Sequence, residues 1–164
     1  MAVEMKATGM EDVSRMLETL DDQADAVAKR GLYKGAGIMA DTLSEASNRI
    51  RTAPFKWAGQ GETRMPSPEE AAVVAKSGIG IAKFDANGTE VSTAVGYGNS
   101  GYAKLAGKTV PIAKIANAIN SGTSFMQKQP FVRSAVNKAK DSASAAIAAE
   151  IEAAVNEITG GTET

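Results

Sequence analysis

Few side chains in this sequence could carry out acid–base or nucleophilic chemistry. The chain contains no histidine and no cysteine, which excludes Ser-His-Asp and Cys-His catalytic arrangements, disulfide bonds and the ordinary zinc ligand sets. Carboxylates remain, but neighbours such as Glu69 and Glu70, or Asp21 and Asp22, point in different directions from a helix. We therefore predict no catalytic, cofactor-binding or metal-binding residues, and no enzymatic activity. A hydrolase that uses a carboxylate pair is the enzymatic alternative, and no spacing favours one.

One stretch resembles a nucleotide-binding loop. Residues from Gly101 to Thr109 include a second glycine, Gly107, followed by Lys108, as in a phosphate-binding loop. Such a loop has four residues between its glycines so that backbone N–H groups surround a phosphate, whereas this one has five. Pro111 also removes a backbone donor shortly afterwards. The pattern therefore favours a flexible loop over a nucleotide site.

A small basic and aromatic patch lies between residues 49 and 64. Its cations are Arg49, Arg51, Lys56 and Arg64, and its aromatic rings are those of Phe55 and Trp57. Cations interleaved with rings are typical of surfaces that bind nucleic acid. Arginine and aromatic residues are also enriched where subunits meet, and we favour that second interpretation.

Helices must position these residues, and hydrophobic spacing predicts several. A short amphipathic helix from Met10 is expected to end at Asp21 and Asp22, after an N-terminal strand over 3–7. A second helix, with an apolar stripe from Ala28 to Ile50, is expected to end before Pro54. Its interior glycines imply burial against a closely approaching backbone or subunit. The longest helix is predicted from Pro130 to Ile158, with Glu150, Glu152 and Glu157 on a solvated face rather than lining a polar lumen.

Shorter elements are predicted between the long helices. Residues 55–66 form an extended loop, and Ser67-Pro68-Glu69-Glu70 opens a helix with a capping box. Strand-like runs on either side of Asn87-Gly88 predict a β-hairpin. A glycine-rich stretch follows, and a further helix runs from Pro111 to Asn120.

Length and composition bound the architecture. The chain has 164 residues, of which 43% are hydrophobic and 23% charged, which is typical of a folded soluble domain. We expect one domain over 1–158 and a flexible tail over 159–164. The formal net charge of -1 gives no general attraction to nucleic acid or anionic lipid. We found no membrane-spanning run or signal peptide, so synthesis in the cytosol is expected.

Several strings, in order, resemble one protein family. Gly9-Met10-Glu11-Asp12-Val13 introduces the first helix, and a long helix ends at Ala53-Pro54. Near the other end, Ile119-Asn120-Ser121-Gly122-Thr123-Ser124 is followed by Gln129-Pro130-Phe131-Val132-Arg133-Ser134-Ala135. In this arrangement the chain resembles the neck and tail-completion (head-to-tail joining) proteins of long-tailed bacteriophages. The resemblance covers residues 1–54 and 79–158, and its most specific part is the Pro130-Phe131 helix entry.

The resemblance implies both a fold and a role. The implied fold is α+β, a small antiparallel sheet with a β-hairpin packed against two long amphipathic helices and shorter helices. The implied role is non-enzymatic: a structural virion protein, made in the host cytoplasm, that forms a ring, typically hexameric, at the head–tail junction. Its implied partners are further copies of itself and other neck, connector and tail-tube proteins, with genomic DNA passing through the lumen without specific binding and with no membrane.

Candidate contact residues follow from this hypothesis. We expect side chains on loops and helix ends to anchor the next subunit, and the candidates are Trp57, Tyr102, Phe131 and Arg133. Within the same class, the chain is alternatively a tail terminator that caps the tail tube. In another class, it is a nucleic-acid-binding accessory protein that uses Arg49, Arg51, Lys56 and Arg64.

Overall fold

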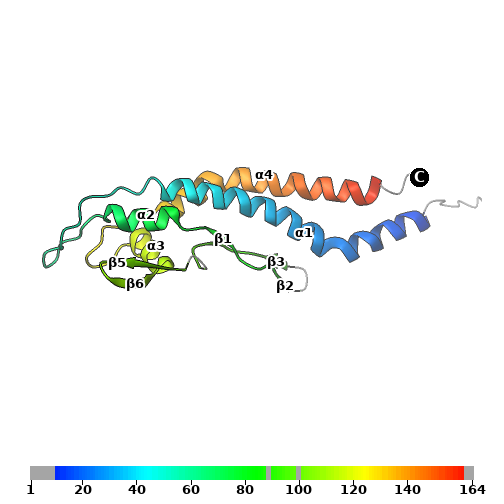
Figure 1. The fold of residues 1–164 in the computed structure, drawn as a ribbon. Coiled ribbons are helices and arrows are strands. Elements are labelled where there is room, and N and C mark those ends of the chain that lie inside the picture. Colours follow the sequence, from blue (N-terminus) through cyan, green and yellow to red (C-terminus); the bar gives the residue numbers. More distant parts are fainter. Residues whose placement is uncertain (1–9, 88–89, 99–100, 161–164) are drawn as a thin grey trace, which may run out of the picture.

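Two long helices run antiparallel along most of the molecule (Figure 1). The computed structural model describes residues 10–87, 90–98 and 101–160, with side chains from residue 14 onward. The helices of this part are α1 (Met10–Ser47), α2 (Pro68–Lys76), α3 (Ile112–Ser121) and α4 (Phe131–Gly160). The strands are β1 (Gly80–Ile81), β2 (Asp85–Asn87), β3 (Glu90–Ser92), β4 (Val95–Gly96), β5 (Tyr102–Leu105) and β6 (Lys108–Pro111). The predicted α+β class, with small antiparallel sheets against two long helices, is confirmed.

Helix α1 is one continuous helix, so the predicted break at Asp21 and Asp22 is wrong. Aspartate inside a helix costs only a few tenths of a kcal/mol, and the alanines that follow favour helix. The C-terminal end also differs from the prediction, because α1 ends at Ser47 rather than just before Pro54. The Arg49 N–H donates to the Ala46 carbonyl at 3.1 Å. This bond spans three residues instead of four, so it forms a tighter turn that ends the α-helix. The predicted strand over 3–7 lies outside the described residues.

The predicted capping box of α2 is confirmed. The Ser67 hydroxyl accepts from the Glu70 N–H at 3.2 Å, and the Glu70 carboxylate accepts from the Ser67 N–H at 2.8 Å. Pro68 occupies the first turn, where its missing N–H has no consequence. The helix ends at Lys76, with Ser77 as its C-cap.

The hairpin of β2 and β3 is present in a shifted register. Asn87 pairs with Glu90 and belongs to β2, so it is not a central turn residue as predicted. Asp85 therefore faces Ser92 and avoids the like-charge contact with Glu90 that the predicted turn implied. Further along, the pairing of β1 with β4 is offset by one residue, which indicates a β-bulge between the two ladders.

A second hairpin occupies the stretch predicted as a flexible glycine-rich loop. Strands β5 and β6 pair from Tyr102 with Pro111 to Leu105 with Lys108. The two residues between them, Ala106 and Gly107, both have positive φ, at 49° and 77°, as a tight two-residue hairpin turn requires. The prediction of a flexible loop here is therefore wrong.

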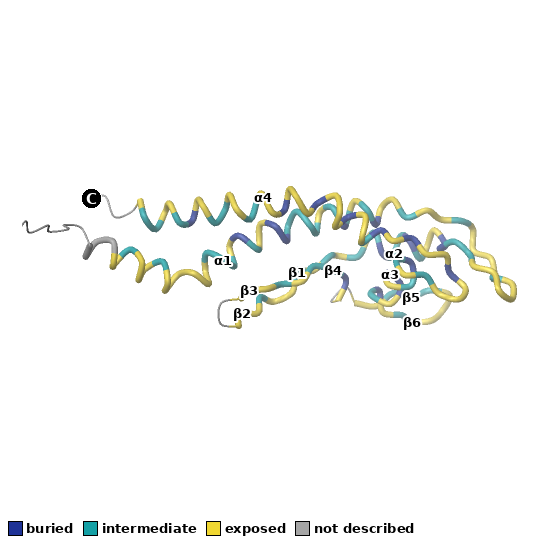
Figure 2. Tube along the Cα trace, turned by 180° about the vertical axis from the view of Figure 1, so that it is seen from behind, coloured by how far each residue is buried: buried dark blue, intermediate teal, exposed yellow. Residues whose placement is uncertain are grey.

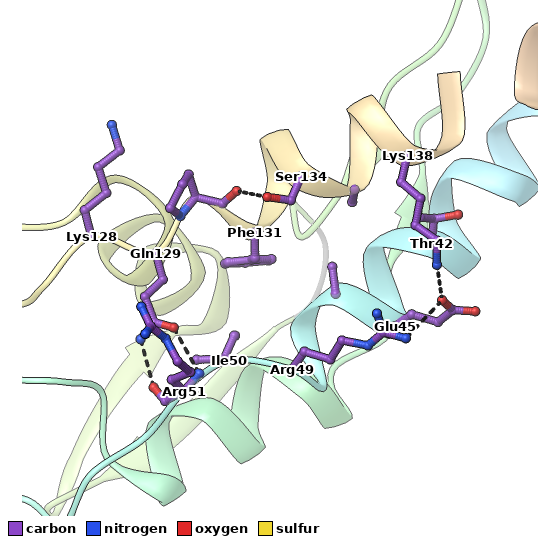
Figure 3. Close-up of a pocket in the computed structure, with 13 residues that line it drawn as sticks. Thr42, Glu45, Arg49, Ile50, Arg51, Lys128, Gln129, Phe131, Ser134 and Lys138 are labelled. Atoms are coloured by element: carbon purple, nitrogen blue, oxygen red, sulfur yellow. Dashed lines mark hydrogen bonds and ion pairs between the residues drawn. The ribbon is translucent and has the colours of Figure 1, made fainter. Parts of the chain in front are cut away.

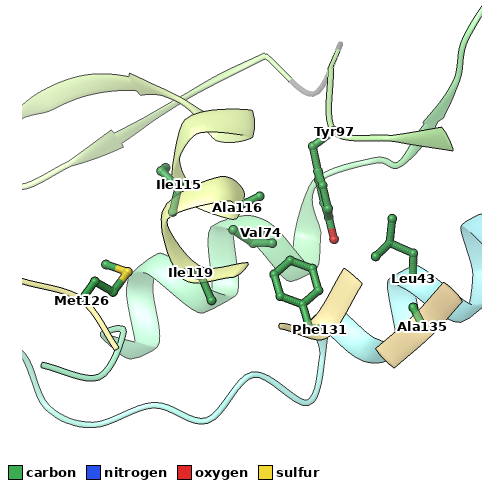
Figure 4. Close-up of a cluster of buried hydrophobic side chains, with 9 residues drawn as sticks. All are labelled: Leu43, Val74, Tyr97, Ile115, Ala116, Ile119, Met126, Phe131 and Ala135. Carbon is green, nitrogen blue, oxygen red and sulfur yellow. The ribbon is translucent and has the colours of Figure 1, made fainter. Parts of the chain in front are cut away.

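The core lies at one end of the long helix pair. The last turns of α1, the first turns of α4, helices α2 and α3 and the β4 and β6 ends converge there (Figure 4). Its buried residues are Leu43, Val74, Tyr97, Ile115, Ala116, Ile119, Met126, Phe131 and Ala135. Away from this end the two helices pack mainly against each other, and α1 also contacts the ribbon of β1 to β4 (Figure 2). The molecule is therefore an arm attached to a small globular base.

Glycines let the two arm helices approach closely, as their position in an apolar stripe predicted. A Cβ atom built at Gly35 would lie 2.5 Å from Ile147 Cγ1 and 3.3 Å from the Ala143 carbonyl oxygen. At Gly31 it would lie 2.7 Å from Ile151 Cγ1. Gly37 has no atom within 4 Å of such a position and takes no part in this packing. Arg30 reinforces the contact through ion pairs with Glu150 at 2.5 Å and Glu157 at 2.7 Å.

This packing makes a prediction with an internal control. Gly35→Ala should destabilise the protein by about 1–2 kcal/mol, because overpacking outweighs the gain in helix propensity. Gly37→Ala should instead stabilise it by about 0.5–1 kcal/mol, since only the propensity changes. Urea unfolding of the two variants measures both effects. Equal stabilisation by both substitutions would show that the arm helices are not in close contact at Gly35.

Candidate interaction surface

A cleft of about 310 Å³ lies where the end of α1 meets the start of α4 (Figure 3). Ile50, Phe131 and Ala135 give it an apolar lining. Four cations also line it, Arg49, Arg51, Lys128 and Lys138, together with one carboxylate, Glu45. The N-terminal end of α4, which carries a partial positive charge, opens into the same cleft. An apolar cleft surrounded by positive charge favours an apolar ligand segment that also carries carboxylates.

Gln129 fixes the backbone of this cleft. Its side chain is buried, accepts from the Arg51 N–H at 2.9 Å and donates to the Arg51 carbonyl at 2.8 Å. The Gln129 N–H donates in turn to the Ile119 carbonyl at 2.8 Å at the end of α3. This glutamine joins segments that are 78 residues apart, and no local sequence signal could have singled it out.

The charges of the cleft are only partly neutralised. Glu45 accepts from Lys138 Nζ at 2.9 Å and lies 4.0 Å from Arg49 Nη2. The hydrogen bond from Lys138 holds the pKa of Glu45 below its usual value. Within the described ranges, no carboxylate forms an ion pair with Arg51 or Lys128. The cleft thus keeps a positive surplus at neutral pH.

Arg64 does not belong to this positive surface, which corrects its predicted place in the basic patch. Its guanidinium forms two hydrogen bonds with the Glu70 carboxylate, both at 2.7 Å, and lies 4.8 Å from the centre of the Phe55 ring. The two charged side chains are only 12% and 15% exposed. Burial acts to raise the pKa of Glu70, but the bonds from Arg64 and the Ser67 N–H lower the pKa below its usual value.

The aromatic part of the patch lies at the far end of the base. The loop over 51–66 projects there (Figure 1). A hydrogen bond from the Ala53 N–H to the Pro66 carbonyl, at 3.1 Å, joins the two ends of this loop. The Trp57 side chain is 88% exposed and meets Phe55 edge to face at 5.2 Å. Lys56 is exposed on the same loop. An exposed tryptophan on an anchored loop suits contact with another molecule.

The remaining candidate contact residues divide between surface and core. Tyr102 on β5 is 73% exposed, and Arg133 in the first turn of α4 is exposed. Phe131 is only 7% exposed, and its ring packs edge to face against Tyr97 at 6.2 Å. Phe131 is therefore a core residue, and its predicted role as a surface anchor is wrong. An aromatic residue at a helix start carries no sign of which way it will face.

Metal-binding clusters and membrane-spanning helices are both absent from the described ranges. These ranges hold no group of three or more acidic, histidine or cysteine side chains placed to bind a metal ion. In that part of the chain, none of the helices is long and apolar enough to cross a membrane. Comparison of the whole chain with family models, curated proteins and solved structures finds no match.

The Arg64–Glu70 pair predicts a change in acid stability. Because the folded pKa of Glu70 is lowered from 4.5, the pair stabilises the fold above that pH and is lost as pH falls through the folded pKa. Glu70→Gln should cost about 1–2 kcal/mol at pH 7, and the difference from the unsubstituted protein should shrink below pH 4.5. Denaturant unfolding over a pH series measures this.

The neighbouring carboxylate supplies the control. Glu69 is exposed in the same helical turn, so Glu69→Gln should change stability by less than about 0.5 kcal/mol. If the two glutamine variants have the same free energy of unfolding at every pH, the Arg64–Glu70 pair does not stabilise the fold.

Proposed function

We propose that this chain is a structural virion protein of a tailed bacteriophage, one subunit of a ring at the head–tail junction that completes the neck or tail. The observation that supports this best is the amount of surface that the chain leaves uncovered. Its accessible surface is 11497 Å², whereas a folded monomer of 16.9 kDa exposes about 7,700 Å². A chain with so much surface is suited to being covered by other subunits.

The nature of the exposed side chains points the same way. Large apolar residues lie on the surface at separate places along the molecule: Leu17, Tyr33, Phe55, Trp57, Tyr102, Phe125 and Val136. They are spread over both long helices, the loop over 51–66 and the base. Apolar and aromatic groups distributed in this way favour several protein contacts per subunit over one enclosed ligand site.

The strings that resemble the neck and tail-completion proteins have structural tasks in this fold. Gly122 ends α3 with φ 76°, and its N–H donates to the Ala118 carbonyl at 2.9 Å. Asn120 Oδ1 accepts from the Val132 N–H at 3.1 Å, which ties the end of α3 to the start of α4. The quoted strings thus coincide with the junction that organises the base, which supports the proposal.

In the proposed ring, each copy meets its neighbours through two different surfaces. Such heterologous contacts close into a ring when the rotation between copies divides a full turn. The exposed rings of Trp57 and Tyr102 are the residues that anchor a neighbouring copy. Other neck, connector and tail-tube proteins cover the two faces of the ring. Genomic DNA passes through the lumen without specific binding, and the site of action is the virion.

A tail terminator is the nearest alternative, and position in the particle separates the two. We expect purified particles to contain the chain, and a phage deleted for it to make tails of normal length that fail to join heads. Electron microscopy of the deletion lysate measures this. Overlong tails would instead identify a terminator, and absence of the chain from purified particles would refute both roles.

The exposed loop allows a test at a single residue. Trp57→Ala should leave the melting temperature within about 2 °C of the unsubstituted protein, because the ring has few contacts to lose. It should nevertheless lower incorporation into particles by roughly tenfold if the tryptophan anchors a neighbour. Plaque assays and particle composition measure this effect. The control is Gln60→Ala, which removes an exposed polar side chain from the same loop and should leave incorporation unchanged.

A further inference from the structure

The N-terminal turns of α1 extend beyond the helix that covers the rest of α1. In both views they diverge from α4 and continue past its C-terminal end (Figures 1 and 2). Their apolar residues Met16, Leu17 and Leu20 continue the stripe that packs on α4 further along. Leu17 is 60% exposed, and Met16 and Leu20 are half-buried. This apolar stripe lacks a covering element within the described part of the chain.

The same turns are strongly acidic. Residues 10–25 contain six carboxylates, from Glu11, Asp12, Glu18, Asp21, Asp22 and Asp25, against one arginine, Arg15. Asp21 follows Leu17 by one helical turn and Asp25 follows by another, so both lie beside the apolar stripe. Both aspartates are exposed. We call residues 14–25 the acidic arm tip.

The cleft at the other end of α1 has the complementary properties. It combines an apolar lining with a surplus of cations from Arg49, Arg51 and Lys128. The acidic arm tip combines an exposed apolar residue with a surplus of carboxylates. One chain cannot bring the two together, because 30 residues of helix between Leu17 and Ser47 span about 45 Å. A contact between the tip and a cleft must therefore join different molecules.

We propose that the acidic arm tip of one copy docks in the α1–α4 cleft of the next copy. In this contact Leu17 lies against Ile50, while Asp21 and Asp25 face Arg49 and Arg51. The two surfaces differ, so the contact is heterologous and each copy uses one tip and one cleft. The inference rests on the proposed function, because it assigns one further contact between neighbouring copies of that ring.

Charge reversal tests the contact from both sides. Asp21→Lys with Asp25→Lys should weaken self-association by roughly tenfold or more, and so should Arg49→Glu with Arg51→Glu, because each variant places like charges in contact. Analytical ultracentrifugation at low and high salt measures this, with circular dichroism confirming the fold. The control for the cleft variant is Lys83→Glu with Lys104→Glu, which makes the same change in net charge at exposed positions elsewhere and should leave association unchanged.

Mixing the two reversed proteins gives the decisive result. Each variant alone has tip and cleft of the same sign, whereas in the mixture every tip meets a cleft of opposite sign. Association should therefore return in the equimolar mixture, and also in one chain that carries all four substitutions. A contact between two tips or between two clefts pairs like charges before and after either reversal, so it predicts that neither double variant weakens association.

Cross-linking gives a readout that does not depend on stable association. Because the chain contains no cysteine, Leu17→Cys and Arg49→Cys are the only thiols in a mixture of the two variants. A short bifunctional maleimide should join one variant to the other and should give little product with either alone. A wild-type chain that stays monomeric at every concentration, together with no cross-link in the mixture, overturns the proposal.

Two other outcomes also overturn this contact and are distinguishable from failure of the proposed function. If both charge reversals leave association intact while particles still contain the chain, the ring exists but uses other surfaces. If instead duplex DNA is retained at low salt by the wild type and lost with Arg49→Glu and Arg51→Glu, while association is unchanged, the cleft binds nucleic acid. A chain absent from particles that also never self-associates refutes the proposed function itself.

Discussion

The close contact between α1 and α4 is the constraint on which the rest of the structure depends. Gly31 and Gly35 remove the side chains that would keep the two backbones apart, and Ile147 and Ile151 fill the space they leave. A glycine inside a helix costs up to about 1 kcal/mol, so such positions persist where packing offsets that cost. Because the helices are antiparallel, the same contact brings the end of α1 to the start of α4. The basic cleft and the core of the base both form at that junction.

The antiparallel arrangement also separates the charges. Carboxylates dominate the N-terminal turns of α1, whereas cations dominate the region where α1 ends and α4 begins. The formal net charge of -1 hides this separation, since the two ends cancel. Opposite charges at the two ends would favour end-to-end contacts between copies, and salt would weaken such contacts. The net charge of the chain is therefore a poor guide to what each of its two ends can bind.

Periodicity and capping residues were sufficient to predict α4, the start of α2 and the close approach at Gly35, because those features are encoded within a few turns of chain. Several predictions failed, and three of them show the physical reasons. The aspartates at 21 and 22 are weak signals beside the cooperativity of a long helix. The hairpin turn at Ala106-Gly107 needs positive φ at a residue that seldom adopts it. Arg64 was assigned to the surface because its pairing with Glu70 depends on how the loop closes. The cleft was beyond prediction, since Gln129 assembles it from segments that are remote in sequence.

The direction of the arm decides what a tip-to-cleft contact would build. Each copy contributes one tip and one cleft, so successive copies are related by a fixed rotation that depends on how α1 leaves its contact with α4. A rotation that divides a full turn closes into a ring, and any other rotation produces a filament. The divergence of α1 from α4 near its N-terminal end (Figure 2) therefore matters more for the number of subunits than any single contact does. Because Arg30 links α1 to Glu150 and Glu157 of α4, contacts inside the folded monomer contribute to this angle.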